Sequence, residues 1–221
     1  MKQETTNPND ESHITKYDEI LGELKKILSA NPGYKLYVSG HSLGAAMATV
    51  FSFFLANEPN DVIPKPVSCI NFASPRVGDG NFLKAVNALE SRGYLRMCRI
   101  VNDKDTISCI PTINFYHVGF QVKLYDKPDE DSPVPEPEIT YPKIVDSYWN
   151  KLARAYSNSF VASLNLEYDH GSYRERVLMT EEYLSKYNLN EMYGNRESVT
   201  GFSIKYGIAA IKDQEGEQQR N

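Results

Sequence analysis

Ser42 lies where a short apolar segment meets a helix-forming one, a position at which a serine hydroxyl can act as a nucleophile. The pentapeptide Gly40-His41-Ser42-Leu43-Gly44 has the G-x-S-x-G pattern, in which a sharp turn presents one serine. Glycines two before and two after that serine leave room for a tightly packed turn. We therefore predict a nucleophile elbow and interpret His41 as structural, because neighbouring side chains on such a turn point apart.

The flanking segments supply the strand and the helix that an elbow needs. Residues 34–39 alternate apolar and polar side chains, which predicts a strand, and residues 45–56 form a helix-favouring run without Gly or Pro. The backbone N–H of Leu43 then lies in the first helical turn, where amides lack intrahelical acceptors and the helix dipole favours negative charge. We predict that this amide donates a hydrogen bond to a developing oxyanion.

A serine nucleophile needs a base, which in this topology follows the serine in the chain. His117 and His170 are the two histidines downstream of Ser42. His117 falls in residues 115–125, which we predict to be a strand in which a packed imidazole has a structural role. His170 lies in a turn-like segment before the amphipathic residues 173–187, so we predict a loop position and the role of general base.

The acid that orients the base is expected at the end of another strand. Residues 94–102 are a strand candidate, and both Asp103 and Asp105 follow it. Either carboxylate could hold the imidazole in the productive tautomer and stabilise the imidazolium. Asp169 is a rival, but as the immediate neighbour of His170 it would have difficulty reaching the ring from the side opposite the serine.

Five short motif blocks occur in a fixed order along the chain. They are GHSLGAA at 40–46, NFASPRVGD at 71–79, RIVN at 99–102 with Asp105 and Pro111, HVG at 117–119, and DHGSY at 169–173. Together, from about residue 14 to about residue 184, they resemble the class 3, fungal-lipase-like triacylglycerol lipases. The resemblance implies an α/β-hydrolase-like fold, a mostly parallel sheet flanked by helices. It also implies a triad of Ser42, Asp105 and His170 that uses neither a cofactor nor a metal.

The chain departs from that family before the elbow. Members usually carry upstream strands, an F-R-G-S/T motif that supplies a second oxyanion donor, and a lid helix. Here a polar leader at residues 1–12 and one amphipathic helix precede the elbow. We therefore expect an N-terminally truncated form with half of the oxyanion hole. Residues 34–39 would then be an exposed sheet edge, unless residues 198–211 add a strand.

Composition indicates one globular domain. The chain has 221 residues, which we divide into a disordered leader at 1–12, a lipase-like domain at 13–190 and a partly disordered tail at 191–221. The formal net charge is −5 and the Lys and Arg residues are scattered, which argues against a nucleic-acid partner. The acidic, proline-rich residues 126–142 are expected to be a solvated loop.

Cysteine usage and the N-terminus bear on location. The three cysteines cannot all pair within one chain, and free thiols are typical of a reducing compartment. The N-terminus has no apolar segment of the kind found in signal peptides. Both features favour a cytoplasmic location.

The residues and the resemblance together lead to one main functional hypothesis and two alternatives. The main hypothesis is a serine ester hydrolase that cleaves fatty-acyl esters of acylglycerols or related lipids through an acyl-enzyme. Its partners would be a lipid or small ester substrate and, transiently, a membrane or lipid-droplet surface. The alternatives are a catalytically weak or inactive lipase-like binding scaffold and an acyltransferase with the same triad.

Overall fold

Five strands form one sheet whose spatial order, β1-β2-β3-β4-β5, follows the chain. The computed structural model describes residues 14–59, 61–111, 113–141 and 166–194. The first four strands are parallel and β5 pairs antiparallel with β4. The strands are β1 Tyr37–His41, β2 Val67–Phe72, β3 Leu95–Asn102, β4 Phe120–Leu124 and β5 Glu138–Thr140.

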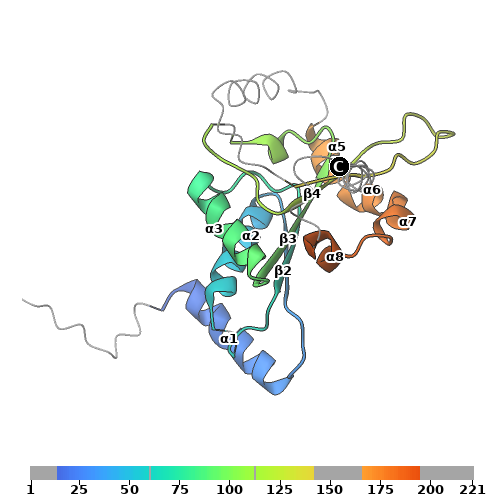
Figure 1. Ribbon diagram of the computed structural model, residues 1–221. Coiled ribbons are helices and arrows are strands. Elements are labelled where there is room, and N and C mark those ends of the chain that lie inside the picture. The colour runs from blue at the N-terminus through green and yellow to red at the C-terminus, as the bar shows by residue number, and fades with distance from the viewer. Residues whose placement is uncertain (1–13, 60, 112, 142–165, 195–221) are drawn as a thin grey trace, which may run out of the picture.

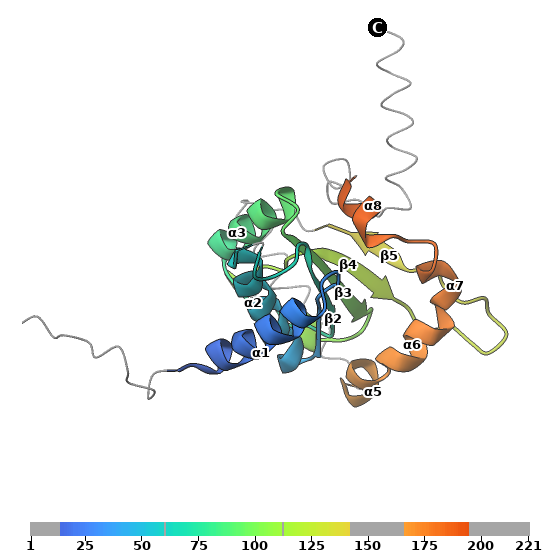
Figure 2. The same ribbon diagram turned by 90° about the horizontal axis from the view of Figure 1, so that it is seen from below.

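Helices cover both faces of this sheet. Figures 1 and 2 show α1, α2 and α3 on one face, and α5 to α8 on the other. The helices are α1 Lys16–Ala30, α2 Leu43–Asn57, α3 Gly80–Ser91, α5 Leu166–Gly171, α6 Tyr173–Met179, α7 Glu181–Leu184 and α8 Leu189–Gly194, with a short 3-10 turn η2 at Ile107–Cys109. The mostly parallel α/β architecture predicted from the sequence is confirmed.

The alternation of side chains along β3 divides the interior into two cores. Leu95 and Met97 pack with α1, α2 and α3, whereas Cys98 and Ile100 pack with residues of α6 and α8. Because β3 is covered on both faces, it is buried at nearly every position, as central parallel strands are. This packing on both faces fixes the carboxyl end of β3, and the acid candidates Asp103 and Asp105 follow directly after it.

The strand β1 is the edge of the described sheet. It pairs with β2, and no other described strand pairs with it. Tyr37 is 61% exposed. The strand also begins later than predicted and runs through His41 into the elbow, so residues 34–36 lie outside it. The predicted open edge is present within the described chain, whereas residues 1–12 and 198–211 lie outside the described residues.

Two other predictions need correction. The strand predicted over residues 115–125 begins only at Phe120, because Gly119 takes a positive φ of 70° and interrupts the extended chain. His117 therefore lies in the loop before β4. The amphipathic residues 173–187 form two short helices, α6 and α7, separated at Thr180.

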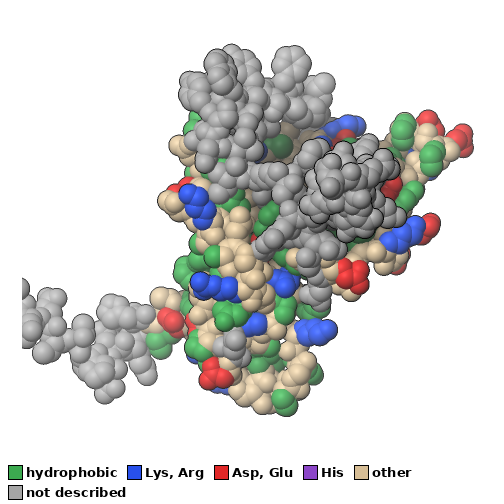
Figure 3. All heavy atoms as spheres, in the orientation of Figure 1, with side chains coloured by type: hydrophobic (Ala, Val, Ile, Leu, Met, Phe, Trp, Pro, Cys, Tyr) green, Lys and Arg blue, Asp and Glu red, His purple; other side chains and the backbone are tan. Residues whose placement is uncertain are grey.

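The connection between β4 and β5 is only partly the predicted solvated loop. Its acidic tip, Asp129 to Asp131, is exposed and projects from the body of the molecule (Figure 3). Residues 138–140, however, return to pair with β4, and Ile139 is buried. A strand of this length is too short for the sequence pattern to reveal.

The described chain ends on a packed element. Helix α8 crosses residue 190, where we place the end of the domain, and buries Met192 and Tyr193. None of the described helices is long and apolar enough to cross a membrane.

Candidate active site

Ser42 occupies a strained turn between β1 and α2. Its φ of 56° and ψ of −124° lie in a region that residues other than glycine rarely adopt. The Ser42 backbone N–H donates to the carbonyl oxygen of Phe72 at 3.0 Å, which ties the turn to the end of β2. The predicted strand, turn and helix around this serine are therefore present.

The two elbow glycines are not equivalent. A β-carbon at Gly40 would lie 2.3 Å from the carbonyl oxygen of Gly44, so no larger residue fits there. A β-carbon at Gly44 would meet nothing within 4 Å. The expectation that both glycines make room for a tightly packed turn thus holds for Gly40 and is wrong for Gly44 within the described chain.

Leu43 begins α2, so its backbone N–H is among the first amides of the helix, which have no intrahelical acceptor. Its side chain is 71% exposed. Met47, one helical turn further on, is 67% exposed. The amide predicted to bind an oxyanion therefore lies beside Ser42, beneath an exposed apolar side chain.

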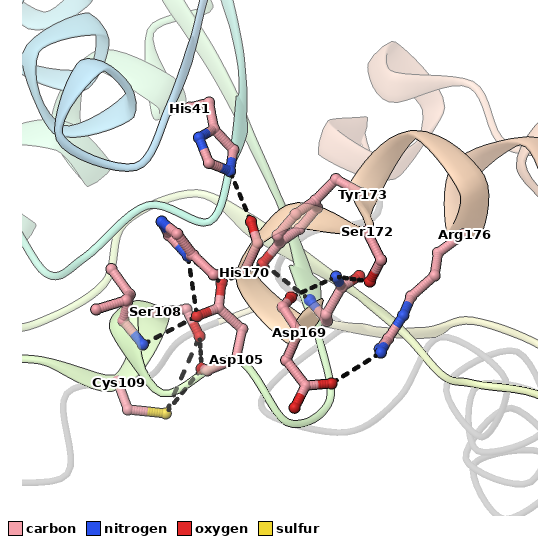
Figure 4. Close-up of polar contacts among 11 residues, drawn as sticks. His41, Asp105, Ser108, Cys109, Asp169, His170, Ser172, Tyr173 and Arg176 are labelled. Carbon is pink, nitrogen blue, oxygen red and sulfur yellow. Dashed lines mark hydrogen bonds and ion pairs between the residues drawn. The ribbon is translucent and has the colours of Figure 1, made fainter. Parts of the chain in front are cut away.

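Asp105 is the carboxylate that the fold brings to His170 (Figure 4). Its side chain is fully buried, and its two carboxylate oxygens, Oδ1 and Oδ2, lie 3.2 and 3.1 Å from His170 Nδ1. It also accepts hydrogen bonds from the Tyr173 hydroxyl at 2.6 Å and from the Ile107 backbone N–H at 2.9 Å. A buried carboxylate held by these hydrogen bonds is well suited to orient an imidazole.

His170 lies in the last turn of α5, not in the predicted loop. Its carbonyl oxygen is 2.9 Å from His41 Nε2, and the two imidazole rings are 4.7 Å apart between centroids (Figure 4). Because Ser42 directly follows His41, this contact places the predicted base beside the elbow. The Ser42 hydroxyl itself donates no hydrogen bond to another described residue, a common state of catalytic serines before substrate binds.

The contact of His41 with His170 was missed by sequence reasoning. The prediction that His41 points away from Ser42 gave it no partner, and nothing in the local pattern links it to a residue 129 positions later. The ring of His41 also meets the ring of Tyr173 edge-on at 5.7 Å. His41 is therefore packed against the segment that carries the base.

The other two acid candidates have a different partner. Arg176, with a fully buried side chain, donates to Asp103 at 2.9 Å and to Asp169 at 3.0 Å. A third ion pair joins Arg176 to Asp126 at 2.7 Å. Among these carboxylates and Asp105, only Asp105 is hydrogen-bonded to His170 within the described residues.

Tyr173 and Asn102 complete the surroundings of the acid. The Tyr173 hydroxyl accepts from the Asn102 backbone N–H at 3.1 Å while donating to Asp105. Burial, and then the hydrogen bond to Asp105, raise the pKa of Tyr173 well above its ordinary value, so it stays a donor. Asn102 Nδ2 donates to the Asp169 carbonyl oxygen at 2.7 Å. Position 173 within the DHGSY block was the one signal in the sequence that could have indicated this role.

The described residues offer little support for metal-dependent or thiol-based chemistry. No cluster of three or more His, Cys, Asp or Glu side chains there could hold a metal ion. Burial raises the pKa of Cys69 to about 11 and that of Cys98 to about 12, which suppresses the reactive thiolate. On the face shown in Figure 3, Lys and Arg side chains stand apart from one another.

Comparisons with known proteins show similarity to lipases and phospholipases. The family model described as Lipase (class 3) matches residues 9–115. Phospholipase A1-II 6 of Oryza sativa subsp. japonica is 32% identical over 133 residues, covering 54% of this chain and 32% of that protein. Phospholipase A1-IIgamma of Arabidopsis thaliana is 32% identical over 143 residues, covering 60% and 33%. Among solved structures, lipase II from Rhizopus niveus aligns with a TM-score of 0.43 and 28% identity, over 50% of this chain and 43% of that chain.

Two facts follow from the extent of these matches. The chain spans about a third of the length of the curated relatives named here. The region matched by the family model contains both the elbow at Ser42 and the acid candidate Asp105. The family that this chain resembles is therefore the class 3 lipases, through the match of residues 9–115 and through its named relatives.

Proposed function

We propose that this protein is a serine ester hydrolase that cleaves fatty-acyl esters of glycerolipids. In this proposal Ser42 is the nucleophile, His170 the general base and Asp105 the acid that orients the base. The observation that carries the proposal is the hydrogen bond between His170 Nδ1 and the buried Asp105 carboxylate, beside the strained turn that presents Ser42. The match to the class 3 lipase family model and the relatives named as phospholipases support a lipid ester as the substrate.

Each group has a defined task in the reaction. His170 Nε2 accepts the Ser42 hydroxyl proton while Oγ attacks the ester carbonyl carbon, and the Leu43 N–H donates to the resulting oxyanion. The imidazolium, stabilised by Asp105, then gives its proton to the departing alcohol oxygen, which leaves an acyl-enzyme. Water deprotonated by His170 attacks the acyl carbon, releases the fatty acid and restores Ser42.

The supply of oxyanion donors determines how fast this site works. The Leu43 amide is the one donor beside Ser42 that we identify in the described part of the chain. Each missing donor in such a site costs about 10²- to 10³-fold in turnover. The site is therefore expected to be a slow catalyst with this donor alone.

A lipid surface fits the exposed side chains at the carboxyl edge of the sheet. Ile110 is 47% and Ile113 is 71% exposed in the segment after Asp105, and Leu43 is 71% exposed at the start of α2. The ends of parallel strands meet at one sheet edge, so these residues border the same side of the molecule as the triad. We propose that they contact the lipid aggregate from which the substrate is drawn.

The test is replacement of the nucleophile. Ser42→Ala is expected to abolish hydrolysis of acyl esters and covalent labelling by a fluorophosphonate probe, because the labelled atom is removed. Ser39→Ala, which alters an exposed serine on the same strand, is the matched control and should label like the wild type. Equal labelling of wild type and Ser42→Ala would reject the proposal.

A binding scaffold without turnover is the second candidate function. It is favoured by the single identified oxyanion donor and by the Ser42 hydroxyl, which is hydrogen-bonded to no base among the described residues. Folded protein that binds fatty-acyl lipid vesicles, but neither hydrolyses acyl esters of any chain length nor takes the probe at Ser42, would establish it. A measurable chain-length profile of hydrolysis would exclude it.

A further inference from the structure

Arg176 occupies an unusual position for a charged side chain. It lies on α6 with its side chain fully buried, and it bonds to three carboxylates that come from three different segments. Two of those carboxylates adjoin the proposed triad in the chain: Asp103 lies two residues before Asp105, and Asp169 directly precedes His170. One guanidinium therefore bridges the turn that holds the acid and the helix that holds the base.

We propose that Arg176 is a positioning residue that sets the alignment of Asp105 with His170. The proposal rests on the function proposed above. The planar guanidinium offers Nη1 to Asp103 at 2.9 Å and Nη2 to Asp169 at 3.0 Å, so the two segments are held by opposite arms of one rigid fork (Figure 4 shows the Asp169 arm). A flexible point charge could attract both carboxylates but could not fix the distance between them.

The neighbouring contacts show why this bridge matters for His170. Among the described residues, two hydrogen-bond contacts link the main chain of the α5–α6 segment to the sheet and the elbow. The Asn102 side-chain amide donates to the Asp169 carbonyl oxygen, and His41 Nε2 lies 2.9 Å from the His170 carbonyl oxygen. Both of these ties act on main-chain atoms. The Arg176 bridge acts on side chains, as does the hydrogen bond from the Tyr173 hydroxyl to Asp105, but Arg176 is the side chain that bonds to a neighbour of the acid and to a neighbour of the base at once.

Charge adds a second reason. Three carboxylates surround one guanidinium, and Lys104 Nζ is 3.7 Å from Asp126. Without the guanidinium, the buried carboxylate of Asp169 and the partly exposed carboxylate of Asp103 would lose the cation that they share, and their repulsion would no longer be offset. The acid turn and the base helix would then separate, which lengthens the bond on which proton transfer depends.

The chain offers a matched control within the same cluster. Asp126 makes an ion pair with Arg176 of similar length, but it lies on the connection after β4 and adjoins no proposed triad member. A purely structural cluster predicts the same functional effect from losing any one of its ion pairs. A positioning role predicts a loss of function only for the two carboxylates next to the triad.

The experiment compares Asp103→Asn, Asp169→Asn and Asp126→Asn in the full chain, with Arg176→Lys as a fourth variant. The first readout is the rate constant of fluorophosphonate labelling at Ser42 per folded molecule, with thermal unfolding measured in parallel. We expect Asp103→Asn and Asp169→Asn each to slow labelling about tenfold or more, since a misplacement of about 1 Å can cost 10²-fold. Asp126→Asn should label within about twofold of the wild type even where its melting temperature falls, because Asp126 adjoins no proposed triad member and Arg176 keeps its bonds to Asp103 and Asp169.

A second readout does not depend on activity. The nuclear magnetic resonance signal of the His170 Nδ1–H proton, assigned by its loss in His170→Gln, reports the bond to Asp105. The chemical shift of this proton should change in Asp103→Asn and Asp169→Asn and should be unchanged in Asp126→Asn. Arg176→Lys should resemble the first two, since lysine keeps the charge but loses the fork.

The outcomes separate this proposal from the proposed function. Equal labelling and an unmoved His170 signal in Asp103→Asn and Asp169→Asn would overturn the positioning role, as would an Asp126→Asn effect as large as theirs. If wild type and variants all fail to label, the hydrolase proposal fails. The His170 signal then still decides whether Arg176 aligns the two side chains.

Discussion

The two halves of the proposed site are built differently. The acid–base half, where Asp105 and His170 lie between β3 and α6, is largely buried. It is held together by a hydrogen bond from Tyr173 and by ion pairs of Arg176. The nucleophile half, around Ser42, lies on the edge strand of the described sheet, and its serine hydroxyl has no described hydrogen-bond partner. The parts that orient and move the proton are therefore more fully assembled within this chain than the parts that hold the reacting ester.

This difference suggests which step is slow. The acid–base pair can be ready before substrate arrives, because its bonds are already formed. The ester must be held by the nucleophile half, where the Leu43 amide is the single donor that we identify among the described residues. Changes on the two sides should therefore have different consequences, and the following predictions are ordered by the size of the expected effect.

The largest effect is expected at Asp105. Asp105→Asn replaces the acceptor of His170 Nδ1 by an amide and favours the wrong imidazole tautomer, so turnover should fall by about 10⁴-fold. The measurement is the rate of acyl ester hydrolysis, with Asp61→Asn at an exposed position as the control. A fall in turnover of less than about tenfold would show that the acid–base half of the site, Asp105 with His170, does not carry the reaction.

The elbow glycines test the nucleophile half. Gly40→Ala places a β-carbon 2.3 Å from the Gly44 carbonyl oxygen and should lower the free energy of unfolding by about 3 kcal/mol. Gly44→Ala meets open space within the described chain and should change that free energy by about 0.5 kcal/mol or less. Denaturant unfolding of both variants measures the difference. A strongly destabilised Gly44→Ala would mean that residues outside the described part pack against Gly44.

Tyr173 offers a smaller effect with a pH signature. Tyr173→Phe removes the hydroxyl that donates to Asp105, so turnover should fall about tenfold, the worth of one hydrogen bond to a charged group. Because the pKa of Tyr173 is raised in the folded protein, the unfolded chain loses that proton first as the pH rises above about 10. Stability from this group is therefore complete below pH about 10 and is lost above it.

The matched measurement is stability against pH. The free energy of unfolding of the wild type should decline above pH about 10, and Tyr173→Phe should decline less steeply. Tyr183→Phe, on the neighbouring helix α7, is the control, since its side chain is not buried. Identical alkaline slopes for wild type and Tyr173→Phe would show that the Tyr173 hydroxyl is not held as the structure shows.

Much of the fold was accessible from the sequence because local patterns determine it. The period-2 run before the elbow, the helix-forming run after it and the strand candidate at residues 94–102 each predicted the type of element that the structure contains. The boundaries were less accurate where one residue interrupts a pattern, as Gly119 does before β4. The short strand β5 depends on pairing with β4, a tertiary effect that a local pattern does not contain.

The candidate site was only partly accessible for the same reason. Chemistry alone left Asp103 and Asp105 equal, and the family resemblance favoured Asp105. The structure separates them through Arg176, which lies 73 residues after Asp103 and bonds to it, leaving Asp105 to His170. The contact of His41 with His170 is equally remote in sequence. Such partners are set by packing and not by spacing along the chain.

The most direct test of the central claim is the site and rate of covalent labelling. Wild-type protein is treated with a fluorophosphonate probe and the modified residue is identified by peptide mass spectrometry. The account predicts one adduct, on Ser42, whose formation slows by at least about 10³-fold in His170→Gln, because triad members act as a unit. An adduct elsewhere, or equal labelling of Ser42 in wild type and His170→Gln, would contradict it.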